Sequence, residues 1–182
     1  PQQMFIVFGP FILLLAFILS VEMWRAHRLN WSLGYRLGGG VLALLLAVML
    51  VLLVGGRLNP MTWSTTQFMV NANGGWNTVL GEVAIRRLVG LITLLPLLLG
   101  LIVVVARLFP RPGDDSGLDY PPATGFILLL VGGGLLLVIG PEFVYLRDNF
   151  GTRMNTIFKF YYQAWVLFSI ASAYGVYTLL AD

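Results

Sequence analysis

The sequence predicts an all-α membrane protein, a polytopic bundle of transmembrane helices. Hydrophobic residues make up 58% of its 182 residues and charged residues only 10%, whereas a soluble domain carries roughly 25% charged residues. The apolar residues also gather in five long stretches that hold no charge. A chain with so little polar surface cannot cover itself in water, so its helices are expected in a bilayer.

Each of the five stretches is long enough to cross a membrane as a helix, since a hydrocarbon core of about 30 Å takes about 20 helical residues. The predicted spans are residues 3–21, 37–56, 88–106, 123–140 and 160–181. We treat residues 1–182 as a single transmembrane region. We also expect a longer parent protein, because the chain begins at Pro1 and enters its first span almost at once.

Prolines and glycines mark features inside these spans. Pro10 and Pro96 lie within the first and third spans, where membrane helices tolerate Pro and usually kink. Three consecutive glycines occur at residues 38–40 and again at residues 132–134. They indicate close helix packing, with a hinge or a lipid groove as the alternative.

The segment between the second and third spans, residues 57–87, is too apolar for a free linker. It contains Trp63, Phe68 and Trp76 together with four asparagines. Because Trp anchors chains at the headgroup level, we expect an interfacial or re-entrant segment, with a substrate-facing lid as the alternative. The segment from Glu22 to Arg36 is short and rich in arginine, so we expect it in the cytoplasm. With five predicted spans, the chain is expected to be a multi-pass protein of the cell membrane.

Several site classes are disfavoured by composition. The chain has no Cys, and its one His, His27, lies between arginines in a short loop, where a solvated residue is expected and a metal or pigment ligand is the alternative. Asp114 and Asp115 lie in a loop rich in Pro and Gly, so we expect solvation and not metal binding. No metal site and no nucleic-acid partner is predicted, and the cofactor is unknown.

Residues 141–165 combine charge with aromatic residues between two apolar spans. Glu142, Arg147, Asp148, Arg153 and Lys159 are five charged residues within eighteen positions. Gly140 and Pro141 are predicted to end a helix, residues 149–151 to turn, and Thr152 to cap the next helix. At 100° per residue that helix carries a polar stripe, which consists of Thr152, Asn155, Thr156, Lys159, Tyr162 and Gln163.

A lysine that enters lipid needs a counter-charge, which Glu142 or Asp148 can supply. A carboxylate beside a cation is a common arrangement for binding an anion or transferring a proton. The alternative is an interfacial belt of ion pairs and aromatic residues that anchors helix ends without chemistry.

The run from Glu142 to Asp148, followed by the run from Arg153 to Trp165, resembles the signature of the Chlor_Arch_YYY membrane proteins. These are large polytopic proteins of uncharacterised function, suspected of kinship with glycosyltransferases that use lipid-phosphate-linked sugars. The resemblance implies that this chain is a late part of such a membrane domain. The catalytic acidic residues of an early external loop in that superfamily have no counterpart here.

The resemblance implies roles for the residues of the signature. Glu142 and Asp148 are the candidate catalytic carboxylates. Arginine and lysine suit the phosphate of a polyprenyl-phosphate lipid, and the aromatic residues suit a sugar or an isoprenoid. The candidate substrate-binding residues are Arg147, Arg153, Asn155, Lys159, Tyr161, Tyr162, Gln163 and Trp165.

Two functions therefore remain open. The first is a glycosyltransferase-like membrane enzyme that binds membrane lipids, including a polyprenyl-phosphate lipid. The second is a structural or accessory subunit that joins other membrane subunits in a larger complex, such as a photosynthetic or energy-converting one. A transporter is disfavoured, because five spans are few, no inverted repeat is visible and the charges gather at one end.

Overall fold

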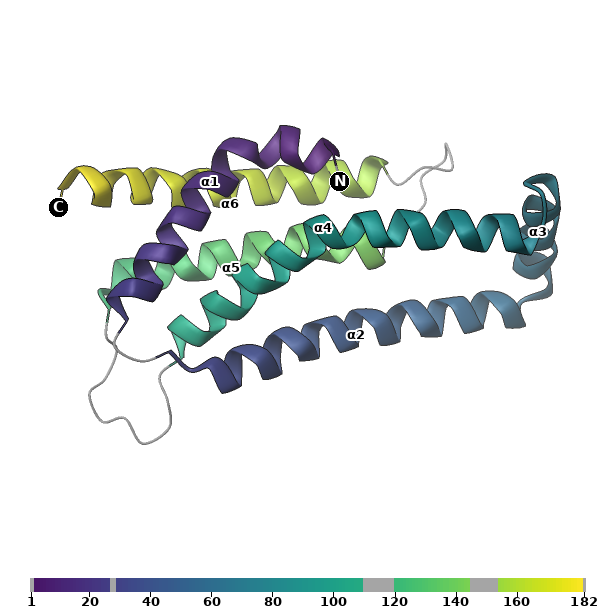
Figure 1. Ribbon diagram of the computed structural model, residues 1–182, viewed down its shortest axis with the longest axis horizontal. Coiled ribbons are helices and arrows are strands. Elements are labelled where there is room, and N and C mark those ends of the chain that lie inside the picture. The colour runs from purple at the N-terminus through teal and green to yellow at the C-terminus, as the bar shows by residue number, and fades with distance from the viewer. Residues whose placement is uncertain (1, 27–28, 110–119, 145–153, 182) are drawn as a thin grey trace.

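The computed structural model describes residues 2–26, 29–109, 120–144 and 154–181 (Figure 1). Its helices are α1 (Gln2–Arg25), α2 (Trp31–Leu58), α3 (Pro60–Ala72), α4 (Trp76–Leu108), α5 (Pro122–Phe143) and α6 (Met154–Ala181). No strand occurs within these described ranges. The prediction of an all-α polytopic bundle is confirmed.

Four of the described helices are long and apolar enough to cross a membrane. They are α1 from Val7 onward, α2, α4 and α5, and they contain most or all of the first four predicted spans. The fifth predicted span lies in α6, which has 28 residues but is not among these four. Lysine, glutamine, serine and several tyrosines interrupt the apolar residues of α6, so its crossing stays a prediction.

The core lies where α1, the second half of α4, α5 and α6 meet (Figure 1). In α5, Leu128, Val131 and Ile139 are completely buried, and 56% of its most apolar window is inside the protein. In α2 the corresponding share is only 6%. α5 is therefore the central helix of the bundle, and α2 lies at its edge.

The glycine runs pack as predicted at some positions only. A Cβ on Gly134 would lie under 3.0 Å from ring atoms of Phe168 in α6, and a Cβ on Gly132 would lie 3.2 Å from Val104 in α4. Gly38 meets the side chain of Ile102 in the same way, whereas Gly39 and Gly40 have nothing within 4 Å. Side chains of neighbouring helices therefore pack directly against the first three glycines and not against the last two.

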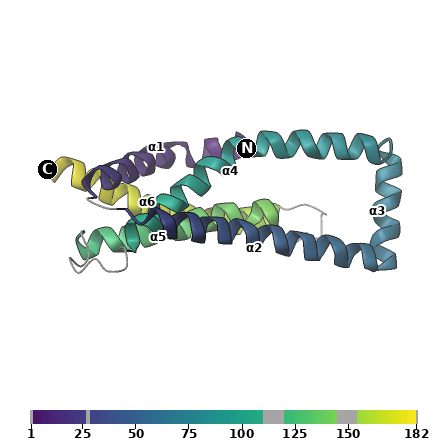
Figure 2. The same ribbon diagram turned by 60° about the horizontal axis from the view of Figure 1, so that its bottom comes forward.

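The segment between the second and third predicted spans is helical, not a loop. α3 lies across one end of α2 and α4 and joins them (Figure 2), and α4 already begins at Trp76. The side-chain oxygen of Asn59 accepts from the N–H groups of Met61 and Thr62 and so caps α3. Gly74 and Gly75, at φ 87° and 90°, make the turn into α4, a conformation that only glycine adopts cheaply.

Aromatic stacking holds this end of the protein together. The rings of Trp63 in α3 and Trp76 in α4 stack with centroids 5.8 Å apart, and the guanidinium of Arg57 lies 4.7 Å from the Trp63 ring. Trp and Arg are the usual headgroup anchors, and the interfacial position of α3 stays a prediction.

Pro10, Pro96 and Pro141 lie inside described helices, and only the position of Pro141 differs from the prediction. Pro141 was expected to end the fourth span, but α5 continues through it to Phe143. One proline in the last turn removes a single backbone hydrogen bond, which the helix tolerates. Pro96 lies inside α4, which changes direction along its length in Figure 1, and Pro10 lies inside α1.

Candidate functional site

The first turns of α6 hold the described part of the predicted site. Asn155, Lys159 and Gln163 are one turn apart, and all three are exposed. Ala164 and Phe168 of the same helix are buried in the core. This part of the predicted polar stripe therefore faces away from the bundle, whereas Thr156 is half-buried and Thr152 lies outside the described residues. Within the described residues, Lys159 forms no ion pair.

The predicted aromatic residues gather beside this stripe around one apolar cavity of about 480 Å³. Tyr161, Tyr162 and Trp165 all line it, and Val7 of α1 completes it from the other side. The full lining is Val7, Met154, Ile157, Phe158, Tyr161, Tyr162 and Trp165. Three of the predicted substrate-binding residues therefore line one cavity, and the sequence gave no reason to expect α1 beside them.

Ring contacts fix the walls of this cavity. Tyr161 packs edge-on against Phe8 with ring centroids 5.1 Å apart, and Trp165 packs in the same manner against Phe11 at 5.6 Å. Phe158 stacks on Tyr162 at 6.5 Å. Such pairs stabilise beyond their buried area, so α1 and α6 hold the aromatic wall in place.

The rest of the predicted site is placed only in part. Glu142 lies half-buried in the last turn of α5. Arg147, Asp148 and Arg153, together with the predicted turn at 149–151 and the Thr152 cap, lie outside the described residues, as do His27, Asp114 and Asp115. The pairing of Lys159 with Glu142 or Asp148 stays a prediction.

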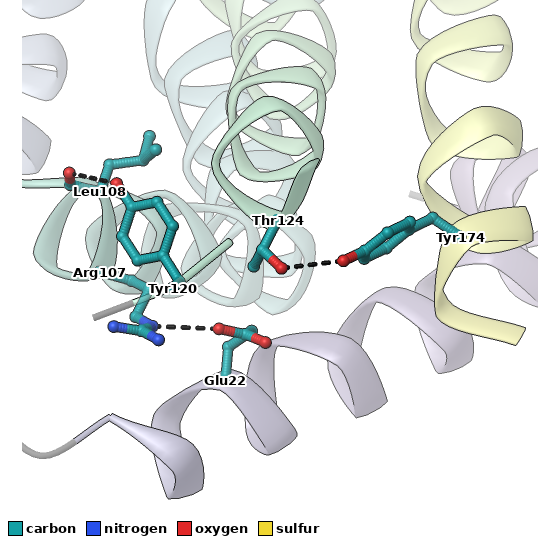
Figure 3. Close-up of polar contacts among 6 residues, drawn as sticks. All are labelled: Glu22, Arg107, Leu108, Tyr120, Thr124 and Tyr174. Carbon is teal, nitrogen blue, oxygen red and sulfur yellow. Dashed lines mark hydrogen bonds and ion pairs between the residues drawn. The ribbon is translucent and has the colours of Figure 1, made fainter. Parts of the chain in front are cut away.

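A second polar cluster lies at the opposite end of the bundle. Nε of Arg107, at the end of α4, donates to a carboxylate oxygen of Glu22 in α1 at 3.1 Å (Figure 3). The two side chains are only 4% and 10% exposed. Because a buried charge is expensive unless it is paired, this contact holds the ends of α1 and α4 together.

Tyr120 closes this cluster from the segment before α5. Its ring lies 4.8 Å from the Arg107 guanidinium, and its hydroxyl donates to the carbonyl of Leu108 at 2.7 Å. Burial raises the pKa of Tyr120, and the positive charge of Arg107 partly opposes the change. Next to it, the hydroxyls of Thr124 and Tyr174 share a hydrogen bond of 2.9 Å between α5 and α6 (Figure 3).

Asn30 ties the start of α2 to the same end of the molecule. Its backbone N–H donates to the carbonyl of Ala106, and its side-chain oxygen caps α2 by accepting from Leu33. The ends of α1, α2 and α4 thus meet around a few buried polar groups.

Sequence reasoning missed this second cluster. The alternation of the predicted spans puts Arg107 on the same side of the membrane as the segment after Glu22, but the sequence did not indicate that the two residues pair. A signal was available, since each charge lies at the end of an apolar run and alternating spans bring those two ends to one face. Which of several such charges meet depends on helix packing, which hydropathy does not report.

The comparison with protein families identifies the chain at a coarse level. A family described as "Uncharacterized membrane protein (DUF2298)" matches residues 1–168. The chain belongs to this family. Its membership and its four apolar helices establish a membrane protein of uncharacterised type, as the sequence resemblance implied. The name Chlor_Arch_YYY and the glycosyltransferase kinship stay predictions.

Other comparisons add no relative of known activity. The chain has no significant match to a curated protein and none to a solved structure. In the part of the chain that the structure describes, no three His, Cys, Asp or Glu side chains form a group that could hold a metal ion.

Proposed function

We propose that this chain forms the lipid-binding part of a membrane enzyme that acts on a lipid-phosphate-linked sugar. The observation that carries the proposal is the position of Lys159 beside the aromatic cavity of α6. Lys159 directly follows Phe158 and precedes Tyr162 by one turn, and both of these residues line the cavity. A cation at the rim of an apolar cavity suits a phosphate joined to an isoprenoid chain.

The electrostatics of the rim support this function. The Lys159 side chain is exposed, so its ammonium group can approach a lipid headgroup. Asn155 and Gln163, one turn away on either side, add amide donors and acceptors for a sugar. Arg147 and Arg153 are proposed as further phosphate ligands, and Glu142 and Asp148 as the carboxylates that orient them or act as a base.

The test is the transfer of a labelled sugar from a polyprenyl-phosphate donor in membranes that contain the full-length protein. Lys159→Ala removes one charge-assisted contact to phosphate, so we expect product to fall roughly tenfold. Arg36→Ala, which removes an exposed cation from α2, is the matched control and should not change product. An unchanged amount of product from Lys159→Ala, at an unchanged protein level, would exclude the proposed site.

A structural or accessory subunit is the second candidate, and the surface of α2 favours it. Leu50, Val51 and Leu53 are each at least 60% exposed, and the neighbouring apolar residues are also exposed. Such a face suits either lipid or another membrane subunit. Purification from native membranes with no stoichiometric partner would exclude the subunit function.

A further inference from the structure

A second cavity, of about 210 Å³, opens at the end of the molecule opposite to the proposed substrate site. It lies between the last turns of α1, the start of α5 and the end of α6. Three of the polar side chains drawn in Figure 3, those of Glu22, Thr124 and Tyr174, line it. The proposed function does not use this cavity or these residues.

The polar wall of the cavity is rich in hydrogen-bond acceptors. One oxygen of Glu22 accepts from Arg107, and the second points away from that arginine (Figure 3). The hydroxyls of Thr124 and Tyr174 share one proton in their mutual bond, and both oxygens keep lone pairs. The Thr178 hydroxyl donates to the carbonyl of Gly175 and likewise keeps lone pairs.

The rim of the cavity carries a positive charge, opposite to that of Glu22. Arg25 follows Glu22 by three positions in α1, so both side chains lie on one face, with Cβ atoms about 5–6 Å apart. Trp24 is 87% exposed beside it, a position typical of a headgroup anchor. The remaining wall is apolar and extends along α1 toward the bilayer through Val21, Ile18 and Phe17.

We propose that this cavity binds the headgroup of a phospholipid that bears a primary ammonium group, as in ethanolamine phosphate. An ammonium group carries three N–H donors, which the second oxygen of Glu22 and the hydroxyl oxygens of Thr124 and Tyr174 accept. The phosphate, a short linker away, lies against Arg25, whose five N–H donors accommodate it together with other contacts. The acyl chains follow the apolar wall of α1 into the membrane.

Size and charge both agree with a headgroup. The cavity is smaller than the roughly 300–1,000 Å³ of pockets for drug-sized ligands. Arg107 already balances the charge of Glu22, so the count of hydrogen bonds, more than net charge, selects the ligand. A trimethylammonium group has the same charge and no N–H donor, and it should therefore bind more weakly.

The experiment compares phosphatidylethanolamine with phosphatidylcholine of identical acyl chains, by native mass spectrometry of the full-length protein in detergent. We expect phosphatidylethanolamine to bind at least roughly tenfold more tightly. Glu22→Gln and Thr124→Val should each reduce that preference. Tyr177→Phe, an exposed tyrosine on α6 outside the cavity, should leave it unchanged.

Three results would overturn the proposal. The first is equal binding of the two lipids to the unaltered protein. The second is an unchanged preference in Thr124→Val, which stays informative if Glu22→Gln does not fold. The third is equally tight binding of soluble phosphoethanolamine, which would make the ligand a soluble amine. Lys159→Ala should retain the preference, so failure of the proposed function and failure of this site remain distinguishable.

Discussion

The Glu22–Arg107 ion pair connects sequence, packing and stability at single residues. Both charges lie at the ends of apolar runs, and packing of α1 against α4 removes them from solvent. In such a place, removal of one partner leaves an uncompensated charge, whereas removal of both leaves none. The pair therefore specifies which helix ends meet more than it adds net stability.

Arg107→Ala should accordingly lower the free energy of unfolding by about 3–5 kcal/mol. The double variant Glu22→Leu with Arg107→Leu should lose much less than the sum of the two single leucine changes. Thermal unfolding in detergent, read as a double-mutant cycle, measures the coupling. Arg36→Ala is the exposed control and should stay within about 0.5 kcal/mol of the parent protein. Purely additive effects would contradict a coupled pair.

Helix α5 sets the packing at the scale of elements, because close contact with both α4 and α6 depends on its glycines. Gly134→Ala would place a methyl group against the Phe168 ring, which is itself only 2% exposed and cannot move aside freely. We expect this over-packing to cost about 1–3 kcal/mol.

Gly133→Ala is the matched control for that change, since its Cβ would meet Leu167 at an ordinary 3.6 Å. It gains the better helix former without a clash and should be neutral or slightly stabilising. The comparison is made by thermal unfolding of both variants in the same detergent. Equal stability of the two variants would show that α5 and α6 do not approach as closely as the structure indicates.

Hydropathy predicted the helices well because it depends on local composition alone. The runs from Leu37 to Gly56 and from Ala123 to Gly140 fall inside α2 and α5. It placed the start of α4 too late, because the charged residues Glu82, Arg86 and Arg87 limit the apolar stretch at its N-terminal side although the helix continues through them. Charged residues determine where the apolar span begins and ends, whereas caps and turns such as Gly74–Gly75 determine where the helix begins and ends.

The two sites differed in how far sequence could predict them. The wall formed by Tyr161, Tyr162 and Trp165 follows from residues close together in one helix, so their shared face was predictable. The cavity of Glu22, Thr124 and Tyr174 joins three helices that are distant in sequence. The pattern of residues within one helix cannot predict which side chains of distant helices come together.

At the scale of the whole molecule, the two candidate sites lie at opposite ends of the bundle. The end of α1 and the starts of α2 and α5 share one end, whereas α3 and the start of α6 lie toward the other (Figure 1). If α6 crosses the membrane as predicted, its first and last turns face opposite sides. The substrate site and the headgroup site would then serve different leaflets.

Single cysteines test this arrangement directly, because the chain contains no cysteine of its own. Exposed positions for them are Ser32 in α2, Gln67 in α3, and Asn155 and Ala181 at the two ends of α6. A membrane-impermeant thiol reagent applied to sealed vesicles should label Gln67→Cys and Asn155→Cys from one side, and Ser32→Cys and Ala181→Cys only from the other. The side that labels Ser32→Cys also tests the predicted cytoplasmic position of the Glu22–Arg36 segment.

Two controls make the labelling interpretable. All four variants should label once detergent opens the vesicles, and Ala171→Cys, at a completely buried position of α6, should label poorly in both states. Labelling of Asn155→Cys and Ala181→Cys from the same side would mean that α6 does not cross. The fifth predicted span would then be wrong, because the lysine, glutamine and tyrosines of α6 would keep this helix out of the hydrocarbon core.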